Sequence, residues 1–190
     1  MTSSSQVSSI EKTFLNGRVV VLVGDITQQH VSALVNAANW TLLGGGGVDG
    51  AIHRVGGSAV LHECKEIRRT QYPDGLPTGK AIATTAGNLP ADYVIHTVGP
   101  IYGRNPEKQA DLLADCYRNS LELAATLHLQ SVAFPSISTG AFGYPRDEAA
   151  GVGSRAVKEF LAKNSSVAEV RLVFFLKNDA RVFLQFQNFE

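Results

Sequence analysis

The chain of 190 residues has no net charge, because 17 lysines and arginines balance 17 aspartates and glutamates. Proteins that bind nucleic acid over a broad surface usually carry a basic excess, so we do not expect nucleic acid as the main partner. An anionic small ligand is still compatible with this balance. Backbone N–H groups are then better candidates for holding it than lysine or arginine side chains.

Cysteine is scarce, and long apolar runs are absent. Cys64 and Cys116 form no Cys-x-x-Cys pair, which supports neither a disulfide framework nor a zinc site. We expect two reduced thiols that pack as small apolar groups. No stretch approaches the roughly 18 apolar residues of a membrane-spanning helix, and the N-terminus lacks the features of a signal peptide. We therefore expect a cytoplasmic protein, without membrane association, that begins with a flexible Ser-rich tail over residues 1–9.

Short β-branched runs alternate with segments of helical periodicity along the rest of the chain. Several runs are almost wholly apolar, which is typical of central strands covered on both faces. The alternation predicts an α/β fold, a three-layer α/β/α sandwich with a central mixed sheet, formed by residues 10–190 as one domain. The expected strands span residues 19–23, 33–36, 81–85, 93–98, 132–134 and 170–176, and the expected helices span residues 58–69, 110–128, 146–161 and 180–186.

Small and polar residues stand near the carboxyl ends of several expected strands, where ligands bind in sheets of this kind. Asp25 follows the first strand, and the segment 36–39 follows the second. The segment 135–145 follows the fifth strand, and Phe175 lies at the end of the last. We expect these chain-distant segments to converge on one edge of the sheet and form the binding site.

Two of these loops have the composition of phosphate-binding segments. The four glycines Gly44–Gly47 would let the backbone approach a ligand closely, and the helical sequence that follows would aim free N–H groups at an anion. The segment 135–145 is rich in small and hydroxylated residues, which suit a nest of backbone donors. Two opposed loops suit a diphosphate. The alternative for the glycine run alone is a flexible turn.

Rival motifs fail on their context. Gly45-x-Gly47-x-x-Gly50 matches the dinucleotide-binding pattern, but no strand runs directly into it, which argues against a nicotinamide oxidoreductase. Thr78-Gly79-Lys80-Ala81 lacks the first glycine and the final hydroxyl residue of a P-loop. Neither Ser136 nor Ser138 lies in a Gly-x-Ser-x-Gly elbow. No pair of histidines has the spacing of metal ligands, so we expect no metal and no cofactor.

Five motifs occur in order between about Arg18 and Phe186, nearly the whole chain. They are Gly24-Asp25-Ile26-Thr27, Asn36-Ala37-Ala38-Asn39, Gly45-Gly46-Gly47-Val48-Asp49-Gly50-Ala51-Ile52-His53, His96-Thr97-Val98-Gly99-Pro100 and Pro135-Ser136-Ile137-Ser138-Thr139-Gly140. Together they resemble the macrodomain family, in particular its MacroD-type branch, which includes bacterial O-acetyl-ADP-ribose deacetylases. The resemblance implies ADP-ribose as the ligand.

The resemblance also implies a role for each matching residue. Asp25 would accept a hydrogen bond from the adenine amino group beside the Ile26 backbone, and Phe175 would stack on adenine. Asn39 would hold the distal ribose. Asp49 would orient and deprotonate a water, with a ligand phosphate as the alternative or additional base, which makes Asp49 and Asn39 the catalytic candidates. The glycine loop would line the distal ribose and the reactive bond with Gly47, Val48 and Asp49. The second loop would wrap the diphosphate with Ser136, Ile137, Ser138, Thr139, Gly140, Ala141 and Phe142, the last also packing against the distal ribose.

Several positions keep a structural alternative. Asp25 could only cap a following turn, and Asn36 could order its loop or contact the ligand. His53 is interpreted as a packed helix residue, and His96 as a core histidine. Phe174 and Phe175 point to opposite faces, so one belongs to the core. Arg146 could face solvent or contact a phosphate.

The leading hypothesis is a hydrolase, expected to be a monomer, that acts on ADP-ribose linked through an ester. Its substrates would be O-acetyl-ADP-ribose or proteins mono-ADP-ribosylated on acidic side chains. The alternative is a module that binds ADP-ribosylated proteins without cleaving them. Asp49 in its Gly-Gly-Val-Asp setting favours catalysis.

Overall fold

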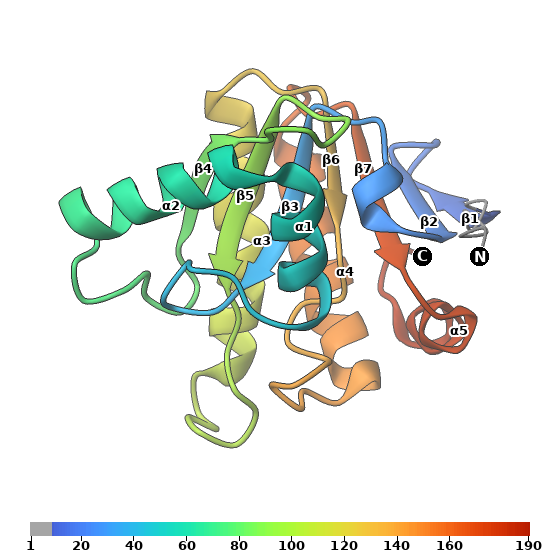
Figure 1. Ribbon diagram of the computed structural model, residues 1–190. Helices are drawn as coiled ribbons and strands as arrows, with labels where there is room; N and C mark the ends of the chain where they lie inside the picture. The colour runs from blue at the N-terminus through green and yellow to red at the C-terminus, as the bar shows by residue number, and fades with distance from the viewer. Residues whose placement is uncertain (1–8) are drawn as a thin grey trace, which may run out of the picture.

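The computed structural model describes residues 9–190, which form a seven-stranded mixed sheet with helices on both faces (Figure 1). The sheet order is β1-β2-β7-β6-β3-β5-β4. The five central strands are parallel, and the edge strands β1 and β4 are antiparallel to their neighbours. The strands are β1 (Ser9–Phe14), β2 (Val19–Val23), β3 (Ala33–Ala38), β4 (Ala81–Thr85), β5 (Tyr93–Val98), β6 (Ser131–Phe134) and β7 (Glu169–Phe174).

The helices α1 and α2 cover one face of the sheet, and α3 and α4 cover the other, with α5 beside α4 and the strands β2 and β7 (Figure 1). The predicted three-layer α/β/α sandwich is therefore confirmed. The helices are η1 (Ile26–Gln28), α1 (Gly47–Gly56), α2 (Ser58–Thr70), α3 (Gln109–Thr126), α4 (Arg146–Lys163) and α5 (Lys177–Phe186).

Strand β2 shows why its apolar run needs two covering layers. Val19, Val21 and Val23 belong to the core under α3, α4 and α5, whereas Val20 and Leu22 belong to the core under α1. Alternate side chains of a strand point to opposite faces, so a run without polar residues must be buried on both. Such burial contributes roughly 1.5–3 kcal/mol for each large aliphatic side chain.

The parallel strands bring their carboxyl ends to one edge of the sheet. Residues 24–25 follow β2, Asn39 follows β3, and Gly99 follows β5. Pro135 follows β6, and Phe175 follows β7. The predicted convergence of chain-distant segments is thus a direct consequence of strand direction.

Several sequence-based element bounds differ from the structure: the last strand ends at Phe174 rather than at 176, and β3 continues to Ala38. Strand β1 was not expected, because its sequence carries Glu11 and Lys12, which are typical of an edge strand. Helix α5 begins three residues before the expected start, since its first turn is polar and shows no apolar periodicity. Residues 1–8 lie outside the described part of the chain, so the flexible tail stays a prediction. No helix within residues 9–190 is long and apolar enough to cross a membrane.

Helix α4 packs closely on α3 at Gly153, which allows a matched test of this contact. A Cβ at Gly153 would lie 2.8–2.9 Å from ring carbons of Tyr117, a buried side chain that stacks on Phe134. A Cβ at Gly151 would meet only ordinary contacts, the nearest at 3.5 Å.

We predict that Gly153→Ala destabilises the fold by about 1–3 kcal/mol through overpacking. Gly151→Ala, on the same helix, should stabilise it by about 0.5–1 kcal/mol because alanine favours the helix. Urea unfolding of both variants measures the two changes. Equal shifts of the same sign would show that the α3–α4 contact does not limit the residue at 153.

Candidate functional site

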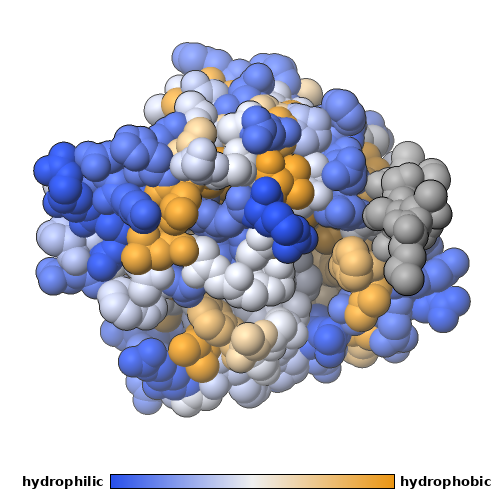
Figure 2. All heavy atoms as spheres, viewed as in Figure 1, coloured by the Kyte–Doolittle hydropathy of each residue, from blue (hydrophilic) through white to orange (hydrophobic). Residues whose placement is uncertain are grey.

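A cleft of about 870 Å³ opens at the carboxyl edge of the sheet. Every predicted site residue lines it except Ile137. Ile137 is fully buried in the core, so the predicted diphosphate contact of this residue stays a prediction. On the face that carries α1, pale surface of intermediate hydropathy occupies the centre, and hydrophobic groups show on both sides of it (Figure 2). The sequence therefore located the cleft but not the direction of every side chain.

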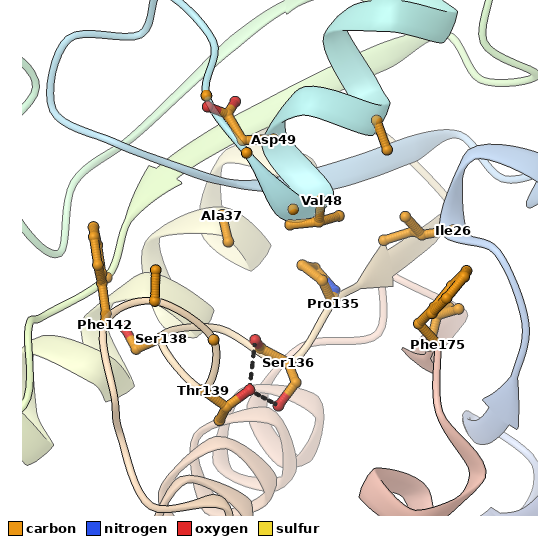
Figure 3. A pocket seen from close by; sticks show the side chains of 18 of the residues that line it. Ile26, Ala37, Val48, Asp49, Pro135, Ser136, Ser138, Thr139, Phe142 and Phe175 are labelled. Carbon is orange, nitrogen blue, oxygen red and sulfur yellow. Dashed lines mark hydrogen bonds between the residues drawn. The ribbon is translucent and has the colours of Figure 1, made fainter.

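One end of the cleft is formed by Phe175 and Ile26, opposite Phe142 (Figure 3). Phe175 is 65% exposed, whereas Phe174 is buried in the core, as their opposite directions required. A flat exposed ring at a cleft wall offers a stacking surface.

Asp25 lies at the same end and also caps η1. Its Oδ1 accepts hydrogen bonds from the backbone N–H of Thr27 at 2.9 Å and from the Thr27 hydroxyl at 2.8 Å. Both bonds use Oδ1, so capping does not occupy Oδ2. Asp25 therefore caps η1, and this capping does not compete with a ligand role for the second oxygen.

The glycine loop delivers the N-terminus of α1 to the cleft. Gly46 is the N-cap residue and provides no side-chain cap for the first-turn N–H groups. Gly50 must be glycine, because a Cβ there would collide with the carbonyl oxygen of Gly45. Uncapped N–H groups and the helix dipole create a partial positive charge at this wall.

The loop after β6 forms the opposite wall. Thr139 donates from its hydroxyl to the carbonyl and the hydroxyl oxygens of Ser136, at 3.1 and 2.8 Å (Figure 3). Ser138 has a φ of +65°, and its carbonyl accepts from the N–H of Tyr144. Within residues 9–190, the backbone N–H groups of Gly140, Ala141 and Phe142 find no acceptor. Both walls of the cleft thus carry backbone N–H groups that have no acceptor in the described residues, which suits an anion between them.

Asp49 is a buried carboxylate at the start of α1. The residue is 5% exposed, and its Oδ1 accepts a 2.7 Å hydrogen bond from Nδ2 of Asn36. Nε2 of His53 lies 3.4 Å from the same oxygen. Burial raises the pKa of Asp49 above its usual value, and the Asn36 bond and the His53 charge offset part of that rise. Such a group can accept a proton more readily than an exposed aspartate.

Two asparagines order this wall in different ways. Asn36 is fully buried and does not line the cleft. Of its two alternatives, we therefore favour a structural amide over a ligand contact. Asn39 lines the cleft and donates from Nδ2 to the carbonyl of Gly44 at 2.9 Å. Its Nδ2 also lies 3.5 Å from Oδ2 of Asp49. Asn39 therefore shapes the glycine loop beside the carboxylate.

The two histidines are packed, as predicted, but they join a grouping that sequence spacing did not show. Ligand atoms of His53, Cys64 and His96 lie within 4.8 Å of one another. Both ring nitrogens of His96 already face polar partners, Asn36 at 3.1 Å and Thr84 at 2.9 Å. Burial raises the pKa of Cys64 to about 12, which keeps it a thiol. We therefore interpret the grouping as core packing. Cys64 and Cys116 are buried and free, as expected.

The cleft also contains charged residues that the sequence did not assign. Arg54, Arg146 and Asp179 line it, and Nε of Arg146 forms a 2.9 Å ion pair with Asp179. Arg54 stands seven residues after Gly47 on α1, a spacing that places both on one helix face and could have revealed it. The pair between α4 and α5 depends on tertiary packing and left no local signal.

Comparison with known proteins gives consistent matches. The model of the family described as Macro domain matches residues 35–152, more than half of the chain. The Macro domain-containing protein in the sno 5' region of Streptomyces nogalater is 54% identical over 157 residues, covering 83% of this chain and 84% of that protein. An O-acetyl-ADP-ribose deacetylase of Klebsiella pneumoniae (strain 342) is 48% identical over 163 residues, covering 86% of this chain and 92% of that protein.

The solved structures agree with the sequence matches. A macrodomain of Oceanobacillus iheyensis with ADP superposes with a TM-score of 0.88 at 44% identity, over 94% of this chain and 93% of that one.

The raised pKa of Asp49 predicts a pH-dependent cost to stability. Ionising this carboxylate is harder in the folded than in the unfolded chain, so the wild type loses stability as pH rises through the folded-state pKa. Below the usual value of 3.8 both states are protonated and the cost vanishes.

We predict that Asp49→Asn raises the melting temperature at neutral pH, and that the difference from wild type shrinks toward zero as pH falls below 3.8. A change of about 1 kcal/mol corresponds to roughly 2–4 °C for a chain of this size, which calorimetry resolves. A variant that is less stable than wild type at neutral pH would contradict this account of the carboxylate.

Proposed function

The chain belongs to the macro domain family, and from that premise we propose that it binds ADP-ribose and hydrolyses an ester bond at the distal ribose. The observation that carries the proposal is the buried carboxylate of Asp49, which lines the cleft at the uncapped start of α1. The relative named O-acetyl-ADP-ribose deacetylase and the neighbouring structure with ADP support the same ligand class.

The ligand would lie across the carboxyl edge of the sheet. Adenine would stack on Phe175 and donate its amino group to Asp25. The diphosphate would sit between the start of α1 and the loop 136–142, where the backbone donors of both walls face the cleft. The distal ribose would then reach the end formed by Asn39 and Phe142. A cleft of about 870 Å³ is in the range of small-molecule sites.

In the proposed reaction, Asp49 accepts a proton from a water that attacks the acyl carbon of the ester. The water oxygen bonds to that carbon, and the bond from the carbon to the ribose oxygen breaks. The proton returns from Asp49 to the ribose oxygen, so the products are a carboxylic acid and ADP-ribose. Contacts to adenine and diphosphate supply binding energy that holds the bond near the base.

Both O-acetyl-ADP-ribose and ADP-ribosylated acidic side chains fit this scheme, because each carries an ester at the distal ribose. A second hollow of about 690 Å³ adjoins the cleft at Gly99 and Phe142 and is also lined by Trp40 and Arg104. Trp40 is 56% exposed there. This hollow gives a polypeptide attached to the distal ribose a place beside the cleft, which favours protein-linked substrates as a second substrate class.

We predict that Asp25→Ala weakens ADP-ribose binding about tenfold to a hundredfold, since a hydrogen bond to a charged group contributes roughly 1.5–3 kcal/mol. Asp25→Asn keeps an oxygen that caps η1 and should lose part of this affinity without losing stability. Calorimetry with ADP-ribose and with its inosine analogue, which lacks the amino group, provides the measurement. If the inosine analogue binds the wild type as tightly as ADP-ribose does, Asp25 does not recognise adenine.

We predict that Asp49→Ala and Asp49→Asn lose about 10²–10⁴ in hydrolysis, the usual contribution of a general base. Both should still bind ADP-ribose within about tenfold of wild type, because the carboxylate repels rather than holds the diphosphate. Single-turnover release from both substrate classes, with calorimetry on the same folded samples, checks the two parts. Intact binding with no turnover by the wild type would instead favour the non-catalytic binding module.

A further inference from the structure

A chain of buried hydrogen bonds runs behind Asp49, away from the cleft. Oδ1 of Asp49 accepts from Nδ2 of Asn36 at 2.7 Å, and the same Nδ2 lies 3.1 Å from Nδ1 of His96. Nε2 of His96 lies 2.9 Å from the hydroxyl of Thr84, which donates to the carbonyl of Thr85 at 3.0 Å. These side chains come from α1, β3, β5 and β4, and Asn36 and His96 are direct cross-strand partners.

Only one assignment of donors and acceptors satisfies all the hydrogen bonds of this chain. The amide nitrogen of Asn36 only donates, so Nδ1 of His96 must be the acceptor and Nε2 must carry the hydrogen. Thr84 spends its single hydrogen on Thr85, so its oxygen accepts from Nε2–H of His96. The reversed amide would place the Asn36 oxygen against the carboxylate of Asp49, which is repulsive.

We propose that Thr84 and His96 are positioning residues for the hydrolysis: together they fix the Nε2–H tautomer of His96, which aims the Asn36 amide at Oδ1 of Asp49 and leaves Oδ2 as the oxygen that accepts the proton. This inference rests on the proposed function of Asp49. It assigns a role in catalysis to two side chains that do not touch the cleft.

Burial makes each bond of this hydrogen-bond chain costly to lose. Asn36 and His96 are fully buried, and Thr84 is 2% exposed, so a polar atom that loses its partner there has no water to replace it. The terminal rotation of an aspartate is otherwise soft, with broad preferences. The Asn36 bond removes that freedom. Oδ2 remains on the side of Asn39, whose Nδ2 is 3.5 Å away.

The hydrogen-bond chain keeps its donors and acceptors when Asp49 gains or loses a proton. Burial lowers the pKa of His96 to about 3, with a smaller contribution from the charge of His53, so His96 stays neutral. The other titratable groups around the carboxylate are His53 on α1, 3.4 Å from Oδ1, and Cys64 on α2, which burial keeps protonated. Glu63 acts on Cys64 through its charge and accepts a 3.0 Å hydrogen bond from the backbone N–H of Thr85. Asp49 is therefore the group expected to shape the pH profile.

The matched pair Thr84→Val and Thr84→Ser tests the inference. Valine has the shape of threonine but cannot accept from His96. The ring must then leave Nε2–H with only the weak acceptor Sγ of Cys64, 3.7 Å away, or move its hydrogen to Nδ1 and turn Asn36 away. We expect Thr84→Val to lower the single-turnover rate about tenfold or more, the loss of one buried hydrogen bond. Its affinity for ADP-ribose should not change, and its acidic pH limb should shift. Thr84→Ser should keep the wild-type rate and profile.

Nitrogen NMR of the His96 ring measures its tautomer directly and needs neither a variant nor turnover. Between about pH 5 and 8 the wild type should show an unprotonated Nδ1 and a protonated Nε2. The opposite tautomer, or a Thr84→Val rate equal to wild type, would overturn the inference. If the wild type cleaves neither substrate class, the proposed function fails, whereas the tautomer result still reports on the hydrogen-bond chain alone. If Thr84→Val does not fold, the NMR arm decides.

Discussion

Burying the carboxylate of Asp49 costs free energy, and several groups around it offset part of that cost. Asn36 gives it a direct hydrogen bond, and His53 lies near the same oxygen. The uncapped start of α1 adds a favourable dipole. The pKa of Asp49 nevertheless remains raised, because desolvation outweighs these interactions. In the proposed function, this raised pKa suits Asp49 as a proton acceptor beside the ester.

In the proposed function, backbone groups would let a chain without net charge hold a doubly charged diphosphate. The glycine loop and the loop after β6 both line the cleft and carry N–H groups that have no acceptor in the described part of the chain. Arg146 lines the same cleft but is paired with Asp179, so its charge is partly used within the protein. Anion binding by fixed backbone dipoles would leave the distal end free for the proposed carboxylate chemistry.

The sequence predicted the parts of this arrangement that depend on local pattern. The β-branched runs located the central strands, and the glycine run located the start of α1. Side-chain direction in irregular loops was not predictable, as Ile137 shows: it follows the same strand as Ser136 but turns into the core. The Arg146–Asp179 pair and the packing of His53, Cys64 and His96 arise from tertiary contacts between separate elements. No spacing rule along one segment could detect them.

The central claim is that water cleaves an ester on ADP-ribose held in this cleft. Incubation of the wild type with O-acetyl-ADP-ribose in ¹⁸O-labelled water, followed by mass spectrometry of both products, tests it most directly. The account predicts that acetate gains the label and that the ribose hydroxyl that carried the acetyl group does not. Unchanged substrate, or label at that hydroxyl, would contradict it.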